Sequence, residues 1–120
     1  MSRPILIEQK KNGQGSLLER IVKNYSRREV HLIFGGEELY EVTERQNYFA
    51  VYFEPRLAQR DQLYWLNNYP GYIIGVLNRK INEDFLKQFI EAGMDDFIYK
   101  PYQPERIGRQ IENREAYISG

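Results

Sequence analysis

Charged and polar side chains follow several of the apolar runs in this sequence. Glu8 and Gln9 follow the first run, Glu54 follows the third, and Lys100 follows the fifth. If these runs are strands of an open parallel sheet, the four side chains meet at its carboxyl edge, where ligands and chemistry are found. Clustered carboxylates at that edge would repel one another unless a cation neutralised them. We therefore expect Lys100 to neutralise Glu8 and Glu54.

The stretch from Glu91 to Pro101 carries the most specific pattern. Gly93 is placed to end a helix in the left-handed conformation, a two-acid turn follows, and a short apolar run leads directly to Lys100. Turn, strand and lysine thus follow one another within 11 residues.

The elements that must position these residues alternate along the chain. Strands are expected at Pro4–Ile7, Val30–Phe34, Tyr48–Phe53, Tyr72–Leu77 and Phe97–Tyr99. Helices are expected from Ser16, which with Glu19 forms a capping box, to Tyr25, from Glu37 to about Gln46, from about Asp61 to the break at 67–71, over 82–92 and from Pro104 onward. The 82–92 helix is expected to place Phe85, Phe89 and Ile90 on one apolar face.

Five strands alternating with five helices predict an α/β fold. The expected architecture is a doubly wound, five-stranded parallel sheet with right-handed crossovers, in the flavodoxin-like order 2-1-3-4-5. The Tyr48–Phe53 run is the most hydrophobic, so we expect it at the centre of the sheet. At 120 residues the chain is long enough for one core, and residues 1–120 are expected to form a single domain.

The Glu91–Pro101 segment resembles the end of response-regulator receiver domains, the CheY-like phosphoacceptor modules of two-component signalling. In that family an Ala-Gly-Ala-Asp-Asp-like turn leads to Lys-Pro, and here Ala92-Gly93-Met94-Asp95-Asp96 leads to Lys100-Pro101. The resemblance covers nearly the entire chain. It implies the same (βα)5 fold.

The resemblance also places the family's functional positions at strand ends. In receivers the first strand ends in two acids that hold Mg²⁺, the third in the phosphoacceptor aspartate, the fourth in Thr or Ser, and the fifth in lysine. These positions fall on Glu8, Gln9, Glu54, Asn78 and Lys100. Only the lysine keeps the family's residue, so the resemblance implies a degenerate site, or pseudo-receiver, without the phosphoacceptor aspartate.

Each change bears on the chemistry that the family performs. Gln9 is a neutral amide, so at most weak Mg²⁺ binding is expected and no other metal or cofactor. Glu54 holds its carboxylate one methylene farther out, whereas phosphoryl transfer depends on placement. Two interpretations of Glu54 remain open. It imitates the phosphorylated state by holding charge nearer to Lys100, or it is a strand-end acid paired with that lysine.

The family's switch is altered as well. Asn78 offers an amide where receivers have a hydroxyl. The switch aromatic falls on Phe97, which has no hydroxyl and is expected to serve the core. After Glu54 the Met-Pro-x-Met-Asp-Gly-like stretch is missing, because Pro55 follows at once.

Receivers commonly bind partners or dimerise through the face of the fourth helix, fifth strand and fifth helix. Tyr99, Tyr102, Arg106 and Arg109 fall on that face here. Tyrosines are favoured at interfaces because they combine an apolar ring with a polar tip. A solvated helix surface is the alternative interpretation.

The composition excludes several functions. Seventeen basic and 17 acidic side chains cancel, so no overall field draws the chain to nucleic acid or to an anionic membrane. The Arg27-Arg28 pair is expected to be solvated. Cysteine is absent and His31 is the single histidine, which argues against thiolate and histidine metal sites. No apolar run approaches the roughly 20 residues of a membrane helix, and a cytoplasmic location is expected.

Three functions fit these observations. The first is a phosphorylation-independent pseudo-receiver of bacterial signal transduction that binds a protein partner or a second copy and is not an enzyme. The second is a Mg²⁺-dependent phosphoacceptor with an unusual site. The third is a small-molecule or nucleotide sensor that uses the loop Gly13–Ser16.

Overall fold

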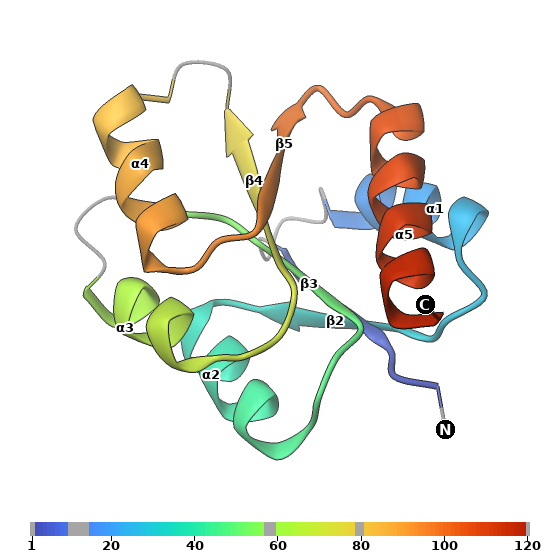
Figure 1. Ribbon diagram of the computed structural model, residues 1–120, viewed down its shortest axis with the longest axis horizontal. Coiled ribbons are helices and arrows are strands. Elements are labelled where there is room, and N and C mark those ends of the chain that lie inside the picture. The colour runs from blue at the N-terminus through green and yellow to red at the C-terminus, as the bar shows by residue number, and fades with distance from the viewer. Residues whose placement is uncertain (1, 10–14, 57–59, 79–80, 120) are drawn as a thin grey trace.

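A computed structural model describes residues 2–9, 15–56, 60–78 and 81–119, with the backbone alone at 15, 16, 36 and 37. The strands are β1 (Ile5–Gln9), β2 (Val30–Phe34), β3 (Ala50–Phe53), β4 (Ile73–Asn78) and β5 (Asp96–Lys100). The helices are α1 (Gly15–Tyr25), α2 (Gly36–Arg45), α3 (Arg60–Asn68), α4 (Glu83–Ala92) and α5 (Pro104–Ser119). Strands and helices alternate as predicted (Figure 1).

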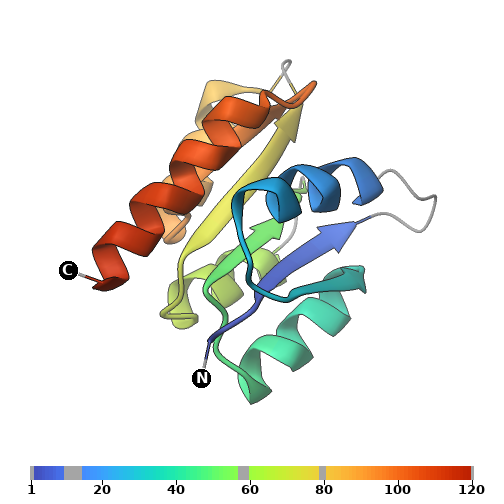
Figure 2. The same cartoon turned by 90° about the vertical axis from the view of Figure 1, so that its right-hand side faces the viewer.

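The strands form one parallel sheet in the order β2-β1-β3-β4-β5. This confirms the predicted fold class, and β3 lies at the centre as expected. Helices α1 and α5 cover one face of the sheet, whereas α2, α3 and α4 cover the other (Figures 1 and 2). All strands point in the same direction, so their carboxyl ends share one edge (Figure 2).

The continuous apolar runs follow from this double coverage. Successive side chains of a strand point to opposite faces, and both faces of the sheet are buried here. In β3, Ala50 and Tyr52 pack under α1 and α5, whereas Val51 and Phe53 pack under α2, α3 and α4. The central strand therefore has no solvated face on which a polar residue could be placed.

Helix α4 ends as the sequence predicts. Gly93 has a φ of 131°, a region that favours glycine, and a Cβ there would lie 2.8 Å from the carbonyl oxygen of Leu66. At the other end, the Asn82 side chain accepts hydrogen bonds from the backbone N–H groups of Asp84 and Phe85. These caps fix where β5 begins.

Some predicted details are wrong. Ile90 is 47% exposed, because the face of α4 that meets the sheet is centred on Phe89, with Phe85 beside it. Strand β3 begins at Ala50 rather than at Tyr48, and α1 begins at Gly15, one residue before the expected start. The side chain of Ser16, on which the predicted capping box depends, lies outside the described residues.

Within the described ranges, none of the helices combines the length and the apolar character needed to cross a bilayer.

Candidate functional site

The predicted site residues do meet at the carboxyl edge of the sheet. Glu8 and Gln9 end β1, Glu54 follows β3, and Asn78 and Lys100 end β4 and β5, where they are directly paired in the strand register. The alternation of strands and helices delivers these residues from distant parts of the sequence to one place, as in other open parallel sheets.

Glu8 is buried, with 3% of its surface exposed. Its Oε1 accepts a hydrogen bond from the backbone N–H of Glu54 at 3.1 Å, and the Arg56 guanidinium lies 3.4 Å from Oε1 and 3.5 Å from Oε2. Burial raises the pKa of Glu8, and the Glu54 N–H and Arg56 oppose this without cancelling it. The Glu54 N–H and Arg56 therefore both favour the charged form of Glu8.

Glu54 forms the second ion pair of the site. Lys100 Nζ lies 2.6 Å from Glu54 Oε1, and both side chains are partly buried. The predicted neutralisation of Glu54 by Lys100 is confirmed. The expectation that Lys100 also neutralises Glu8 is corrected, because the ion pair of Glu8 is made by Arg56.

Arg56 is held in place by a residue of α3. Its backbone N–H donates to Gln62 Oε1 at 2.8 Å, and Gln62 Nε2 donates to the Glu54 carbonyl oxygen at 2.8 Å. Gln62 is fully buried. Sequence reasoning missed both residues. A polar residue among the apolar positions of α3 is the one signal that could have drawn attention to Gln62.

Asn78 is exposed and lines a cavity of about 330 Å³ between the strand ends and α4. Glu54, Pro55, Lys100 and Phe85 also line it. The cavity thus adjoins the Glu54–Lys100 ion pair. Its polar side chains are a carboxylate, an ammonium and the two amides of Asn78 and Asn82, so it can offer a ligand charge and hydrogen bonding.

Gln9 lies beside Glu8 but contributes differently. It is nearly buried, and within the described part of the chain its Oε1 has no hydrogen-bond partner. The loop that follows, predicted as a possible ligand site over Gly13–Ser16, lies outside the described residues except for the backbone of its last two.

Phe97 packs against the core under α2, α3 and α4, as predicted for a core role. The Arg106 guanidinium lies 5.7 Å from its ring centroid, donates to the Phe97 carbonyl oxygen at 2.9 Å, and lies 3.3 Å from Asp96 Oδ1. Tyr99 packs edge-on against Phe97, with ring centroids 5.5 Å apart. The predicted switch position is thus linked to two residues of the predicted interaction face.

Only some residues of the predicted interaction face lie together. Tyr99 and Arg106 line a cavity of about 350 Å³ together with Ile98, Pro101 and Gln103. Arg109 is exposed on α5. Tyr102 packs instead against the core under α1 and α5, where burial first and then the charge of Glu54 raise its pKa to about 12.

The family's Mg²⁺ does not fit the donors present. Mg²⁺ needs carboxylate and other oxygen ligands in near-octahedral geometry. Here the two carboxylates are already engaged by Arg56 and Lys100, and the neighbouring side chain is the amide of Gln9. Among the described residues no group of three or more His, Cys, Asp and Glu side chains is arranged to hold a metal.

Similar proteins are known, although no family model matches the chain. The transcriptional regulatory protein SrrA of Staphylococcus aureus is 28% identical over 101 residues, which is 79% of this chain and 42% of that protein. The chain therefore spans less than half the length of this relative.

Solved structures share the fold. The receiver domain of a sensor histidine kinase from Pseudomonas aeruginosa, with magnesium coordinated in its active-site cleft, superposes with a TM-score of 0.75 at 20% identity, covering 94% of this chain and 97% of that one. The receiver domain of a DNA-binding response regulator from Colwellia psychrerythraea gives 0.78 at 11% identity, with 93% and 97% covered.

Proposed function

We propose that the chain, which has the fold of receiver (CheY-like) domains, is a response-regulator receiver domain that acts in bacterial signal transduction without being phosphorylated. In this proposal the domain is not an enzyme. It acts by binding a protein partner, or a second copy, through the face of α4, β5 and α5.

The observation that carries the proposal is the pairing of charges at the carboxyl edge. Glu8 pairs with Arg56 and Glu54 pairs with Lys100, so two carboxylates are matched by two cations of the same chain. A phosphoacceptor needs its metal and its lysine to stabilise charge that develops on the incoming phosphoryl group. Here Arg56 already balances the charge of Glu8, and Lys100 is already paired with Glu54.

The proposal also accounts for the chemistry of residue 54. The Lys100 Nζ to Glu54 Oε1 distance of 2.6 Å makes a charge-assisted hydrogen bond that the longer glutamate side chain can reach. A permanent bond between the end of β3 and the end of β5 would hold β5 in one arrangement. The binding face would then be constant rather than switched.

The face itself offers groups suited to a protein surface. Tyr99 and Arg106 line a cavity of about 350 Å³, and Arg109 is exposed on α5. Tyrosine and arginine are enriched at interface centres. Of the predicted face residues, Tyr102 contributes least, because it packs against the core.

Two measurements test the chemical part of the proposal. Amide NMR spectra are recorded during titration with Mg²⁺ and then with beryllium fluoride, a phosphoryl mimic, and intact mass is measured after incubation with acetyl phosphate. We expect no shift near Glu54 and Lys100 and no phosphoryl adduct. Stoichiometric, Mg²⁺-dependent modification at Glu54 would overturn the proposal.

Sedimentation over a range of concentrations tests self-association through the face. Arg109→Glu is compared with Arg27→Glu, because both arginines are exposed and only Arg109 lies on α5. If a second copy is the partner, the first variant weakens association and the second does not. Association that responds equally to both substitutions contradicts binding through this face.

A still-active phosphoacceptor is the second candidate, and one observation favours it. Glu8 remains at the end of β1 with its carboxylate within hydrogen-bond distance of the Glu54 backbone N–H, so an acid is retained next to the acceptor position. This candidate requires Mg²⁺ binding that is lost in Glu8→Ala. The same NMR titration, carried out on both proteins, distinguishes the two functions.

A further inference from the structure

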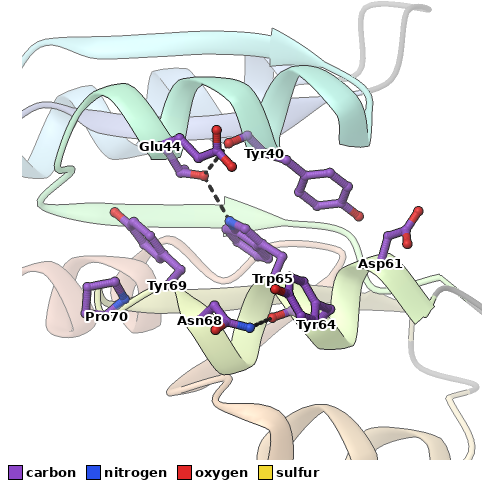
Figure 3. A pocket seen from close by; sticks show the side chains of 9 residues that line it. Tyr40, Glu44, Asp61, Tyr64, Trp65, Asn68, Tyr69 and Pro70 are labelled. Atoms are coloured by element: carbon purple, nitrogen blue, oxygen red, sulfur yellow. Dashed lines mark hydrogen bonds between the residues drawn. The ribbon is translucent and has the colours of Figure 1, made fainter.

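A second cavity lies between α2 and α3. Its volume is about 380 Å³, and it shares no lining residue with the cavity beside Glu54. Four aromatic side chains and two carboxylates line it: Tyr40, Tyr64, Trp65, Tyr69, Glu44 and Asp61 (Figure 3). Its volume falls within the range of small-molecule sites, about 300–1,000 Å³.

The aromatic wall of this cavity is fixed before any ligand arrives. Trp65 and Tyr69 are stacked, with centroids 5.6 Å apart and an interplanar angle of 11°. Trp65 Nε1 donates to Thr43 Oγ1 at 2.9 Å, and Thr43 Oγ1 donates in turn to the Leu39 carbonyl oxygen at 2.8 Å. The Tyr69 hydroxyl accepts from the Tyr48 backbone N–H at 3.3 Å. Both rings are thus held in place, and 7% of the Trp65 surface is exposed.

Tyr40 closes the cavity from α2. Its ring lies 6.1 Å from that of Trp65, at 42°, and its hydroxyl end points toward Asp61 (Figure 3). Burial, followed by the charges of Asp61 and Glu8, raises the pKa of Tyr40 and Arg56 opposes this, so Tyr40 stays neutral at physiological pH. Rings from both helices thus face one hollow.

The charge of the lining is negative. Glu44 and Asp61 are its charged groups, and both are exposed. Neither forms an ion pair within the described ranges of the chain, where the ion pairs involve other acids. Aromatic faces together with carboxylates attract organic cations, because the ring quadrupole presents a negative face.

The lining also selects among cations. A lysine ammonium brings three N–H donors and an arginine guanidinium five, and each donor needs an acceptor. The ring faces supply none, and Thr43 Oγ1 is already engaged by Trp65, so the acceptors of the lining are the Glu44 and Asp61 carboxylates, the Asn68 amide and the tyrosine hydroxyls. A quaternary ammonium group has no N–H to satisfy, so it can lie against the ring faces without reaching these acceptors.

We propose that the cavity between α2 and α3 binds a small quaternary ammonium compound, with its cationic head against Tyr40 and Trp65 and its charge balanced by Asp61. The proposal does not rest on the function proposed for the carboxyl edge, and the charges of Glu8 and Arg56 at that edge act on Tyr40.

Trp65 is the single tryptophan of the chain, so its fluorescence reports on this cavity directly. Choline and tetramethylammonium are titrated at constant ionic strength, with the neutral tert-butyl isostere of choline as the matched control ligand. We expect a saturable fluorescence change with both cations and at least about tenfold weaker binding of the neutral isostere, given the strength of desolvated cation–π contacts. Equal binding of the isostere, or no saturable change with either cation, would overturn the proposal.

Two variants test separately how the charge and the aromatic rings contribute to choline binding. Asp61→Asn and Tyr40→Leu are each expected to weaken choline binding by about three- to tenfold. Asp84→Asn is the control, because Asp84 is also an exposed acid in the first turn of its helix, α4. Amide NMR spectra verify that each variant is folded. An equal loss in Asp61→Asn and Asp84→Asn contradicts the proposal, as does binding of an arginine-containing peptide in place of choline.

Discussion

At the scale of single residues, Glu8 has the least ordinary environment of the site. A carboxylate that is 3% exposed remains charged only at a cost in desolvation, and its pKa is raised for that reason. Two hydrogen-bonding partners, the Glu54 N–H and Arg56, offset part of the cost. The balance between these terms can be measured through the pH dependence of stability.

The first prediction concerns Glu8→Gln. Since the folded-state pKa of Glu8 lies above 4.5, the folded protein binds more protons than the unfolded chain just above that pH, and stability falls as pH rises through this window. Glutamine keeps the acceptor for the Glu54 N–H and removes the charge. We expect the free energy of unfolding at neutral pH to rise by about 1 kcal/mol, because the cost of burying the charge is removed.

The measurement is urea unfolding at several pH values between about 4.5 and about 7.5. The decline of stability with pH should be smaller in Glu8→Gln, whereas Glu112→Gln, at an exposed position of α5, should leave it unchanged. A less stable Glu8→Gln protein at neutral pH would mean that the ion pair with Arg56 outweighs the cost of burial.

The second prediction concerns the Glu54–Lys100 pair. Both side chains are partly buried and meet at 2.6 Å, so a double-mutant cycle of Glu54→Gln and Lys100→Met should give a coupling free energy of about 1–2 kcal/mol, above that of surface pairs. The exposed pair Lys87–Glu91 of α4, at 3.9 Å, is the control and should give about 0.3 kcal/mol. Equal coupling in the two pairs would contradict a structural role for Lys100.

At the scale of elements, helix α4 and the turn after it decide where β5 lies. Gly93 ends the helix with a φ of 131°, and Met94 and Asp95 then donate backbone hydrogen bonds to Phe89 and to Ile73 at the start of β4. The Asp95 carboxylate accepts from the Ile73 N–H at 2.8 Å. The turn thus fixes β5 against β4, and with it the position of Lys100.

The third prediction compares two glycines with positive φ. Gly93→Ala should lower the free energy of unfolding by more than about 2 kcal/mol, because the added Cβ meets a disfavoured φ and lies 2.8 Å from the Leu66 carbonyl oxygen. Gly35 also has a positive φ, of 91°, but no atom lies within 4 Å of the Cβ that Gly35→Ala would add. Gly35→Ala should cost less than Gly93→Ala, about 1–3 kcal/mol from the backbone conformation alone. Chemical denaturation of both variants checks the difference.

At the scale of the whole molecule, the parts that could be predicted from sequence are those that local patterns determine. The β3 run is apolar without interruption because both faces are buried, and this revealed the central strand. Lys100 could be placed because a helix end, a turn and a strand precede it within a few residues. Ile90 was misplaced because periodicity alone does not say which side of an apolar stripe meets the sheet.

The features that could not be predicted from the sequence depend on residues that the fold brings together. Arg56 reaches Glu8 only because Gln62, a residue of the next helix, holds its backbone. The cavity between α2 and α3 likewise requires Thr43 to orient Trp65 across two helices. No spacing in the sequence encodes such distances, so these contacts could be found only in three dimensions.

Arg28 is the clearest example of contacts that only the three-dimensional structure reveals. The expectation that it is solvated is wrong. Its Nε and Nη2 each donate to the Glu115 carboxylate at 2.8 Å, Nη1 donates to the Arg3 carbonyl oxygen at 2.8 Å, and the guanidinium lies 3.9 Å from the Phe49 ring centroid. One side chain thus ties the segment before β1 and the segment before β3 to α5. Planar, two-pronged recognition of this kind is specific to arginine.

The fourth prediction is that Arg28→Lys lowers the free energy of unfolding by about 1–2 kcal/mol, although it preserves the charge. The bond from Arg28 lowers the pKa of Glu115, so its contribution is present above 4.5 and is lost as pH falls below that value. The difference in the free energy of unfolding between the wild type and Arg28→Lys, measured by urea unfolding, should therefore become smaller as pH falls. Arg27→Lys, at the exposed neighbouring position, should change stability by less than about 0.5 kcal/mol. If both substitutions have the same effect, the two-pronged bond does not join these segments.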